Sequence, residues 1–217
     1  MDGVLYDSMP SHARAWSEVL SSVGIKASEE EFYLFEGRTG RSTIQILFNR
    51  TFGRDASPEE VQSIYEKKMQ RFIELEYPES KPMPGALEVL KKTKELGLQR
   101  IIVTGSGQHS LLGKLEKHYP GFFDKELIVT AYDVQNGKPH PEPYLMGLKK
   151  GRLQPEEAMV VENAPLGIES GRAAGIYTIA VNTGPLPNRI LEESGAQIVY
   201  PSLQAFASDL DRLVSLW

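Results

Sequence analysis

The fold is decided by the stretch Ile101-Ile102-Val103-Thr104-Gly105-Ser106, in which a continuous apolar strand runs directly into a turn of small residues. Further short apolar strands follow, separated by helical segments, at 127–129, 159–161, 178–181 and 198–199. Alternating strands and helices with uninterrupted apolar strands predict a doubly wound, Rossmann-like parallel sheet with helices on both faces. In such an α/β fold the chemistry belongs at the carboxyl ends of the strands.

The segment before this core has a helical sequence pattern without alternating strands. Between about Pro10 and Tyr77 the pattern is helical, with start signals at Ser28-x-x-Glu31 and Ser57-Pro58-Glu59-Glu60. The prolines Pro78, Pro82 and Pro84 then mark a linker. We therefore expect an all-helical cap at 9–81, inserted into an α/β core that comprises 1–8 and 82–217.

Composition narrows the possible partners. The 217 residues include no cysteine, which removes disulfides and thiolate chemistry and is compatible with a reducing cytoplasmic location. No apolar run is long enough to span a bilayer, and the net charge of −5 gives no electrostatic footprint for nucleic acid. We expect a monomer that binds a small anionic substrate through a local cationic site, most simply a bound metal ion.

Two strand ends carry groups that suit a phosphate. Thr104-Gly105-Ser106-Gly107-Gln108 offers a hydroxyl and several backbone amides that can cradle phosphate oxygens, although a plain tight turn would look the same. Lys138, fixed between Gly137 and Pro139, is a well-placed point charge for a phosphoryl group, or part of a proline-rich surface loop.

A third strand end suits a metal. Glu162 and Asn163 directly follow the strand at 159–161, and carboxylate and amide oxygens are ligands that Mg²⁺ accepts. The alternative is that Asn163 only caps the next helix, a role for which asparagine is common.

The beginning of the chain connects these signals. Met1-Asp2-Gly3-Val4 reads as the second half of a motif in which two carboxylates, one residue apart, end a buried strand. Followed by strand-Thr-Gly-Ser, Gly-Lys-Pro and strand-Glu-Asn, it resembles the haloacid dehalogenase superfamily, in its β-phosphoglucomutase-like branch with a helical cap. The resemblance extends over nearly the whole chain.

The resemblance implies a mechanism. A nucleophilic aspartate, expected directly before Met1 at the end of a first core strand that the sequence lacks, would form an aspartyl-phosphate. Asp2 would serve as general acid and base, and its backbone carbonyl would bind Mg²⁺. Thr104 and Lys138 would stabilise the phosphoryl oxygens, and Glu162 and Asn163 would hold the metal. Taken literally, the sequence is also compatible with an inactive relative that binds phosphate ligands.

Substrate choice should lie in the cap. The resemblance places His12 near the leaving group, although a helical histidine is as often structural. Sugar phosphomutases of this branch carry lysine where this chain has Glu36, and an arginine near Gly40, where this chain has Arg41 one residue later. A carboxylate at Glu36 could bind Mg²⁺ or its waters, and the pattern resembles the inorganic pyrophosphatase of this branch. We therefore expect pyrophosphate hydrolysis, with a β-phosphoglucomutase or a small sugar-phosphate phosphatase as the alternative.

Overall fold

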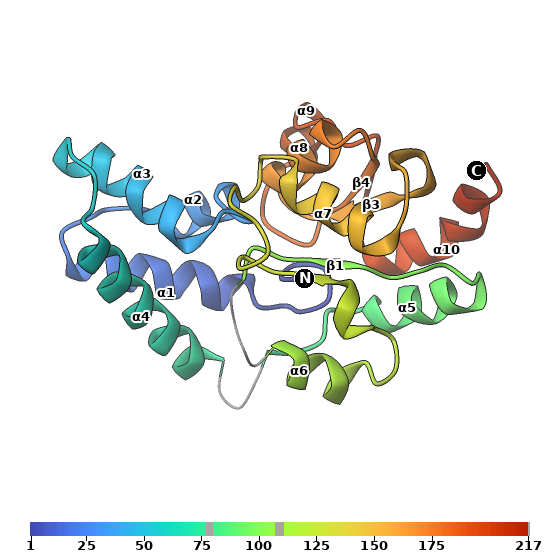
Figure 1. The fold of residues 1–217 in the computed structure, drawn as a ribbon. Helices are drawn as coiled ribbons and strands as arrows, with labels where there is room; N and C mark the ends of the chain where they lie inside the picture. Colours follow the sequence, from blue (N-terminus) through green and yellow to red (C-terminus); the bar gives the residue numbers. More distant parts are fainter. Residues whose placement is uncertain (77–79, 107–110, 217) are drawn as a thin grey trace.

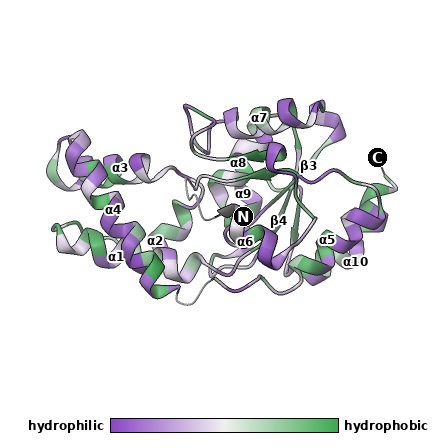
Figure 2. Cartoon of the chain, turned by 60° about the horizontal axis from the view of Figure 1, so that its bottom comes forward, coloured by the Kyte–Doolittle hydropathy of each residue, from purple (hydrophilic) through white to green (hydrophobic). Residues whose placement is uncertain are grey.

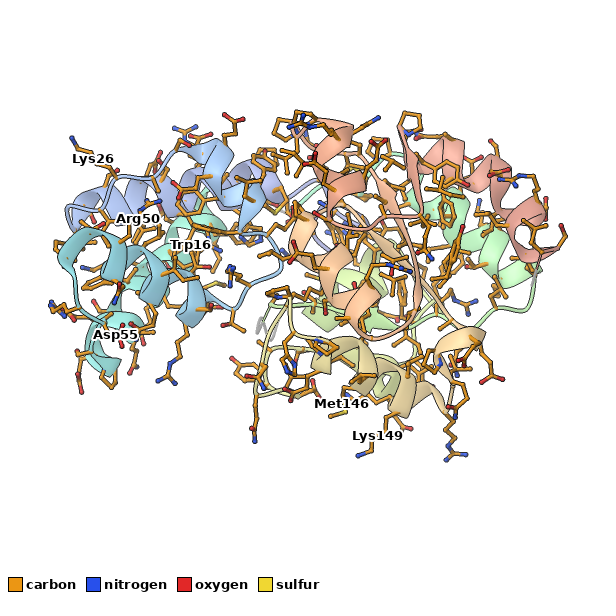
Figure 3. The ribbon with its side chains drawn as sticks, turned by 90° about the horizontal axis from the view of Figure 1, so that it is seen from above. Trp16, Lys26, Arg50, Asp55, Met146 and Lys149 are labelled. Carbon is orange, nitrogen blue, oxygen red and sulfur yellow. The ribbon has the colours of Figure 1, made fainter. Side chains whose placement is uncertain are left out.

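The computed structural model describes residues 1–76, 80–106 and 111–216. Four helices form a separate bundle that lies beside the α/β unit (Figure 1). They are α1 (Met9–Ser22), α2 (Glu29–Leu34), α3 (Gly40–Phe52) and α4 (Pro58–Leu75). Trp16 lies inside this bundle, while Lys26, Arg50 and Asp55 mark its far end (Figure 3).

Local sequence explains where these helices begin. Ser57 and Glu60 form the complete capping box predicted for α4, with Pro58 in the first turn. Ser28 caps α2 by accepting from the Glu31 backbone N–H at 3.3 Å, but the Glu31 carboxylate pairs with Arg50 and does not complete the box. The predicted start of α2 is therefore confirmed, but only one of the two hydrogen bonds of the predicted capping box forms.

The remaining chain alternates helices and strands, as predicted. Its helices are α5 (Ala86–Glu95), α6 (Leu111–His118), α7 (Glu142–Gly151), α8 (Pro165–Ala173), α9 (Asn188–Glu193) and α10 (Leu203–Val214). Its strands are β1 (Ile102–Val103), β2 (Ile128–Val129), β3 (Met159–Glu162), β4 (Tyr177–Val181) and β5 (Ile198–Tyr200). Short 3-10 turns, η1 and η2, cover Lys125–Leu127 and Pro155–Glu157, so Leu127 precedes its predicted strand. The helices carry both hydrophilic and hydrophobic residues (Figure 2). The alternation of helices with parallel strands confirms the predicted α/β class.

The strands are parallel but form two sheets. In the first, β1 pairs with β2; in the second, β4 lies between β3 and β5. The parallel pairing confirms the predicted class, although among the described residues β1 and β3 are not hydrogen-bonded to each other and the strands therefore lie in two sheets.

An apolar cavity of about 610 Å³ lies between these two sheets. Val103 of β1, Val160 and Val161 of β3, Leu5 and Leu210 are among the residues that line it. Both sheets still direct their carboxyl ends toward the helical bundle, and this positions the site.

Within the described part of the chain, no helix is both long and apolar enough to cross a membrane.

Candidate active site

A cavity of about 110 Å³ lies where the helical bundle meets the carboxyl ends of β1 and β3. Most of the residues predicted from the sequence line it. They are Asp2, His12, Glu36, Thr104, Gly105, Ser106, Lys138, Glu162 and Asn163. Segments that are far apart in the sequence thus converge as the strand-end rule requires.

Three predicted residues stand apart from this group. Gly107 and Gln108 lie outside the described residues. Arg41 lies in the first turn of α3, is exposed, and is not among the residues that line the cavity. Arg38, three residues earlier in the loop between α2 and α3, lines it instead.

Asp2 is held by two polar side chains, Ser8 directly before α1 and His12 within α1. The Ser8 hydroxyl donates to Asp2 Oδ1 at 2.6 Å, and His12 Nε2 lies 3.4 Å from the same oxygen. Burial alone would raise the pKa of Asp2, but the net shift is downward, chiefly through the hydrogen bond from His12, with a further contribution from the Ser8 hydroxyl. Asp2 is therefore held as a carboxylate. Gly3, at φ +67°, brings the turn close to Asn163, where a Cβ would lie 1.9 Å from the amide nitrogen.

A buried lysine, which the sequence did not suggest, supports His12. Lys68 Nζ of α4 lies 2.6 Å from His12 Nδ1, and the His12 ring stacks on Phe72 at 3.9 Å between centroids. Burial lowers the pKa of Lys68 to about 8, and burial with the Lys68 charge lowers the pKa of His12. A neutral His12 that accepts from Lys68 presents its Nε2 proton to Asp2.

Thr104 ends β1 in a hydrogen-bonded turn. Its backbone N–H donates to the Val129 carbonyl at 2.9 Å, which extends the β1–β2 pairing by one residue. Its hydroxyl accepts from the Ser106 backbone N–H at 3.1 Å. Thr104 is buried in the cavity wall, where its hydroxyl can also donate to a phosphoryl oxygen.

Lys138 and Glu162 form a buried ion pair at the cavity floor. Lys138 Nζ donates to Glu162 Oε1 at 2.5 Å and to the Val103 carbonyl at 3.3 Å. The Tyr144 hydroxyl, also not anticipated from the sequence, donates to Glu162 Oε1 at 2.5 Å. Burial is the largest influence and opposes ionisation of Glu162, but the charge and hydrogen bond of Lys138, the hydrogen bond from Tyr144 and other nearby positive charge together lower the pKa of the carboxyl. This pair fixes the lysine ammonium at the cavity.

Glu36 brings a carboxylate from the cap onto the strand end. Asn163 Nδ2 donates to both Glu36 carboxylate oxygens, at 2.9 and 3.0 Å. Burial, together with the negative charges of Glu162 and Asp2, raises the pKa of Glu36 to about 8 despite this hydrogen bond. A divalent cation would remove this mutual repulsion.

The donor set suits Mg²⁺, although a complete metal cage is not formed. Among the described residues, no three histidine, aspartate or glutamate side chains gather as a metal site. Asp2, Glu36 and Asn163 offer oxygens at one strand end, while Glu162 is turned toward Lys138. Mg²⁺ needs only one or two protein carboxylates and retains several waters, so these residues fit the ion.

Comparison with known proteins places this site in a family. Residues 1–181 match the haloacid dehalogenase-like hydrolase family. The chain belongs to this family. It is therefore an enzyme of the haloacid dehalogenase phosphatase group, as the resemblance from its motifs predicts.

Individual relatives are similar over most of the chain. Hexitol phosphatase A of Escherichia coli is 32% identical over 188 residues, which cover 84% of this chain and 80% of the relative. A phosphorylated carbohydrates phosphatase of Thermotoga maritima is 30% identical over 207 residues, covering 93% and 92%. The solved structure of a putative β-phosphoglucomutase from Bacteroides vulgatus is 51% identical, with a TM-score of 0.94 over 99% of this chain and 86% of that one.

Proposed function

We propose that this haloacid dehalogenase family member is a Mg²⁺-dependent phosphohydrolase whose substrate is inorganic pyrophosphate. The contact between Glu36 and Asn163 carries this proposal. It places a cap carboxylate against the strand end where the metal would bind, in a cavity of about 110 Å³. Drug-sized ligands occupy pockets of roughly 300–1,000 Å³, so the space favours a compact leaving group.

The residues present divide the chemistry between them. The carboxylate expected directly before Met1 would attack phosphorus, and the bond to the leaving oxygen would break as the aspartyl-phosphate forms. Lys138 and Thr104 lie where they can stabilise the phosphoryl oxygens. Asp2, kept ionised, would take the proton of the water that hydrolyses the acyl-phosphate. Phosphate is a stable leaving group and needs little protonation from Asp2.

Asp2, Glu36 and Asn163 would hold Mg²⁺, which supplies charge stabilisation at the transferred phosphoryl group. His12, positioned by Lys68, would keep the Asp2 carboxylate oriented throughout.

A sugar phosphate is the second candidate substrate, and the relatives favour it. The two curated relatives described above are named for phosphatases of hexitols and phosphorylated carbohydrates, and the solved relative for a putative β-phosphoglucomutase. A sugar leaving group is larger and would need Glu36 and the cap to move aside.

Phosphate release in the presence of Mg²⁺ distinguishes the two candidates. We expect faster release from pyrophosphate than from hexose or hexitol phosphates, measured on protein that includes the aspartate expected before Met1. The Glu36→Ala variant should lose most of the pyrophosphate activity, and Glu29→Ala, an exposed carboxylate at the start of α2, serves as the control. Efficient release from sugar phosphates with little from pyrophosphate would refute the pyrophosphatase assignment.

A further inference from the structure

One cationic residue of the cavity is unexplained by the proposed chemistry. Arg38 lies in the turn between α2 and α3, where its backbone N–H donates to the Phe35 carbonyl at 3.1 Å. Its side chain lines the same cavity as Thr104 and Lys138. Its Nε atom is buried and has no hydrogen-bond partner.

The two lysines at this cavity already have protein partners. Lys138 is paired with Glu162 at 2.5 Å, and Lys68 contacts His12 at 2.6 Å. For Arg38, by contrast, the described residues provide only the face of the Phe35 ring, 5.8 Å from the guanidinium carbon. They provide no ion pair and no side-chain hydrogen bond.

A buried guanidinium nitrogen without an acceptor is costly, because it has lost water and gained no replacement. The cost is removed if a ligand supplies the acceptor. A guanidinium presents planar, paired N–H donors that match two oxygens of one phosphoryl group, whereas an ammonium acts as a point charge. The geometry of the residue therefore selects a phosphoryl or carboxylate group over a neutral hydroxyl.

The main chain of this loop fixes where that group must lie. The Gly37 and Arg38 carbonyls approach Gly105 so closely that a Cβ there would lie 2.8 and 3.3 Å from them. Gly37 itself, at φ +93°, lies against the Lys138 side chain. The Arg38 loop thus covers the turn that follows β1, and it brings a second cationic centre to a cavity whose floor already holds Lys138.

We propose that Arg38 is a substrate-binding residue that recognises a second phosphoryl group, bonded directly to the one that Lys138 and Thr104 hold. The substrate class is then a phosphoanhydride, with pyrophosphate its smallest member, and not a phosphomonoester of a neutral alcohol. This inference rests on the proposed phosphohydrolase function and assigns the leaving-group side of the same site.

Binding of two probes tests this assignment without turnover. Methylenediphosphonate carries two linked phosphoryl groups that cannot be hydrolysed, and inorganic phosphate carries one. With Mg²⁺ present, calorimetry should show that Arg38→Met weakens methylenediphosphonate binding by roughly 10- to 100-fold, the effect of losing charge-assisted hydrogen bonds. Phosphate binding should change by less than about threefold, and Arg38→Lys should recover only part of the loss because it lacks the paired donors.

Matched variants and outcomes make the test decisive. Arg189→Met, an exposed arginine on α9, is the control for removing a positive charge. Equal weakening of both probes, or no weakening of either, would overturn the proposal. The proposal would also be overturned if Arg41→Met, and not Arg38→Met, selectively weakened methylenediphosphonate binding. Substrate turnover by the unmodified protein tests the proposed function separately. Even if the protein hydrolyses only sugar phosphates, the binding measurements still show whether Arg38 distinguishes one phosphoryl group from two.

Discussion

Replacing Glu36 with glutamine should make the metal-free protein more stable at neutral pH, although it removes a residue that we assign to metal binding. The folded protein raises the pKa of Glu36 to about 8, chiefly through burial, from an ordinary value of 4.5. Between these two values the folded chain holds a proton that the unfolded chain releases. The contribution of Glu36 to stability is therefore lost progressively as pH rises from 4.5 toward 8.

The pKa values set the size of the effect. At pH 7 the unfolded carboxyl is fully ionised and the folded one is mostly protonated, so the penalty is on the order of 3 kcal/mol. At pH 5 the unfolded carboxyl is only partly ionised, and the penalty falls to on the order of 1 kcal/mol. Glutamine carries no such penalty and can still face Asn163. For a chain of this length, we expect Glu36→Gln to raise the melting temperature by roughly 5–10 °C at pH 7 and by much less at pH 5.

Differential scanning calorimetry in EDTA, at pH 5 and pH 7, measures both values. Mg²⁺ should reverse the order, because the cation favours the ionised Glu36 and stabilises only the protein that can bind it. Glu29→Gln on the exposed start of α2 controls for the loss of a surface charge. An equal effect of Glu36→Gln at the two pH values, or destabilisation at both, would refute the assignment of a repelled, buried carboxyl at this position.

Two further predictions concern residues around the site. Between pH 8 and 10.5 the unfolded Lys68 keeps a proton that the folded one has lost, because the folded pKa is only about 8, so the free energy of unfolding should rise by on the order of 2–3 kcal/mol over this range. Lys68→Met should remove this rise. Urea unfolding of both proteins at pH 7.5 and 10 measures it, and the same change in unfolding free energy in the two proteins would contradict the prediction. Gly37→Ala should lower kcat roughly 10- to 100-fold, because its Cβ would lie 3.0 Å from Lys138 Cδ. Gly53→Ala has a similar positive φ but no neighbour within 4 Å, so it should cost stability and spare kcat; equal kcat in the two variants would show that the contact is unimportant.

The sequence predicted the parts of this molecule that depend on local pattern. The strands at β3, β4 and β5 and the capping box of α4 follow from apolar periodicity and from specific capping residues. The meeting of Asp2, Thr104 and Lys138 follows from a rule of topology, because parallel strands end at one edge.

What the sequence did not predict depends on three-dimensional direction. Lys68 and His12 are 56 positions apart on different helices, and no periodicity within α4 indicates that this lysine faces a histidine of α1. Arg38 and Arg41 are equally plausible ligands by composition. The positive φ of Gly37 and the start of α3 at Gly40 leave one in the cavity and the other in solvent.

The loop between α2 and α3, which carries the two residues that we propose to select the substrate, is structurally independent of the helices on either side. Phe35 ends one helix and the Thr39 hydroxyl caps the next by accepting from Ser42 N–H at 3.3 Å, so each helix is terminated independently of the residues between them. Glu36 and Arg38 lie between the two helices and outside the apolar cluster of the bundle, while Thr104 and Lys138 lie in loops of the α/β unit. Members of one family can thus diverge in specificity through a few adjacent codons, and laboratory selection restricted to positions 36–38 should be able to retrace that divergence.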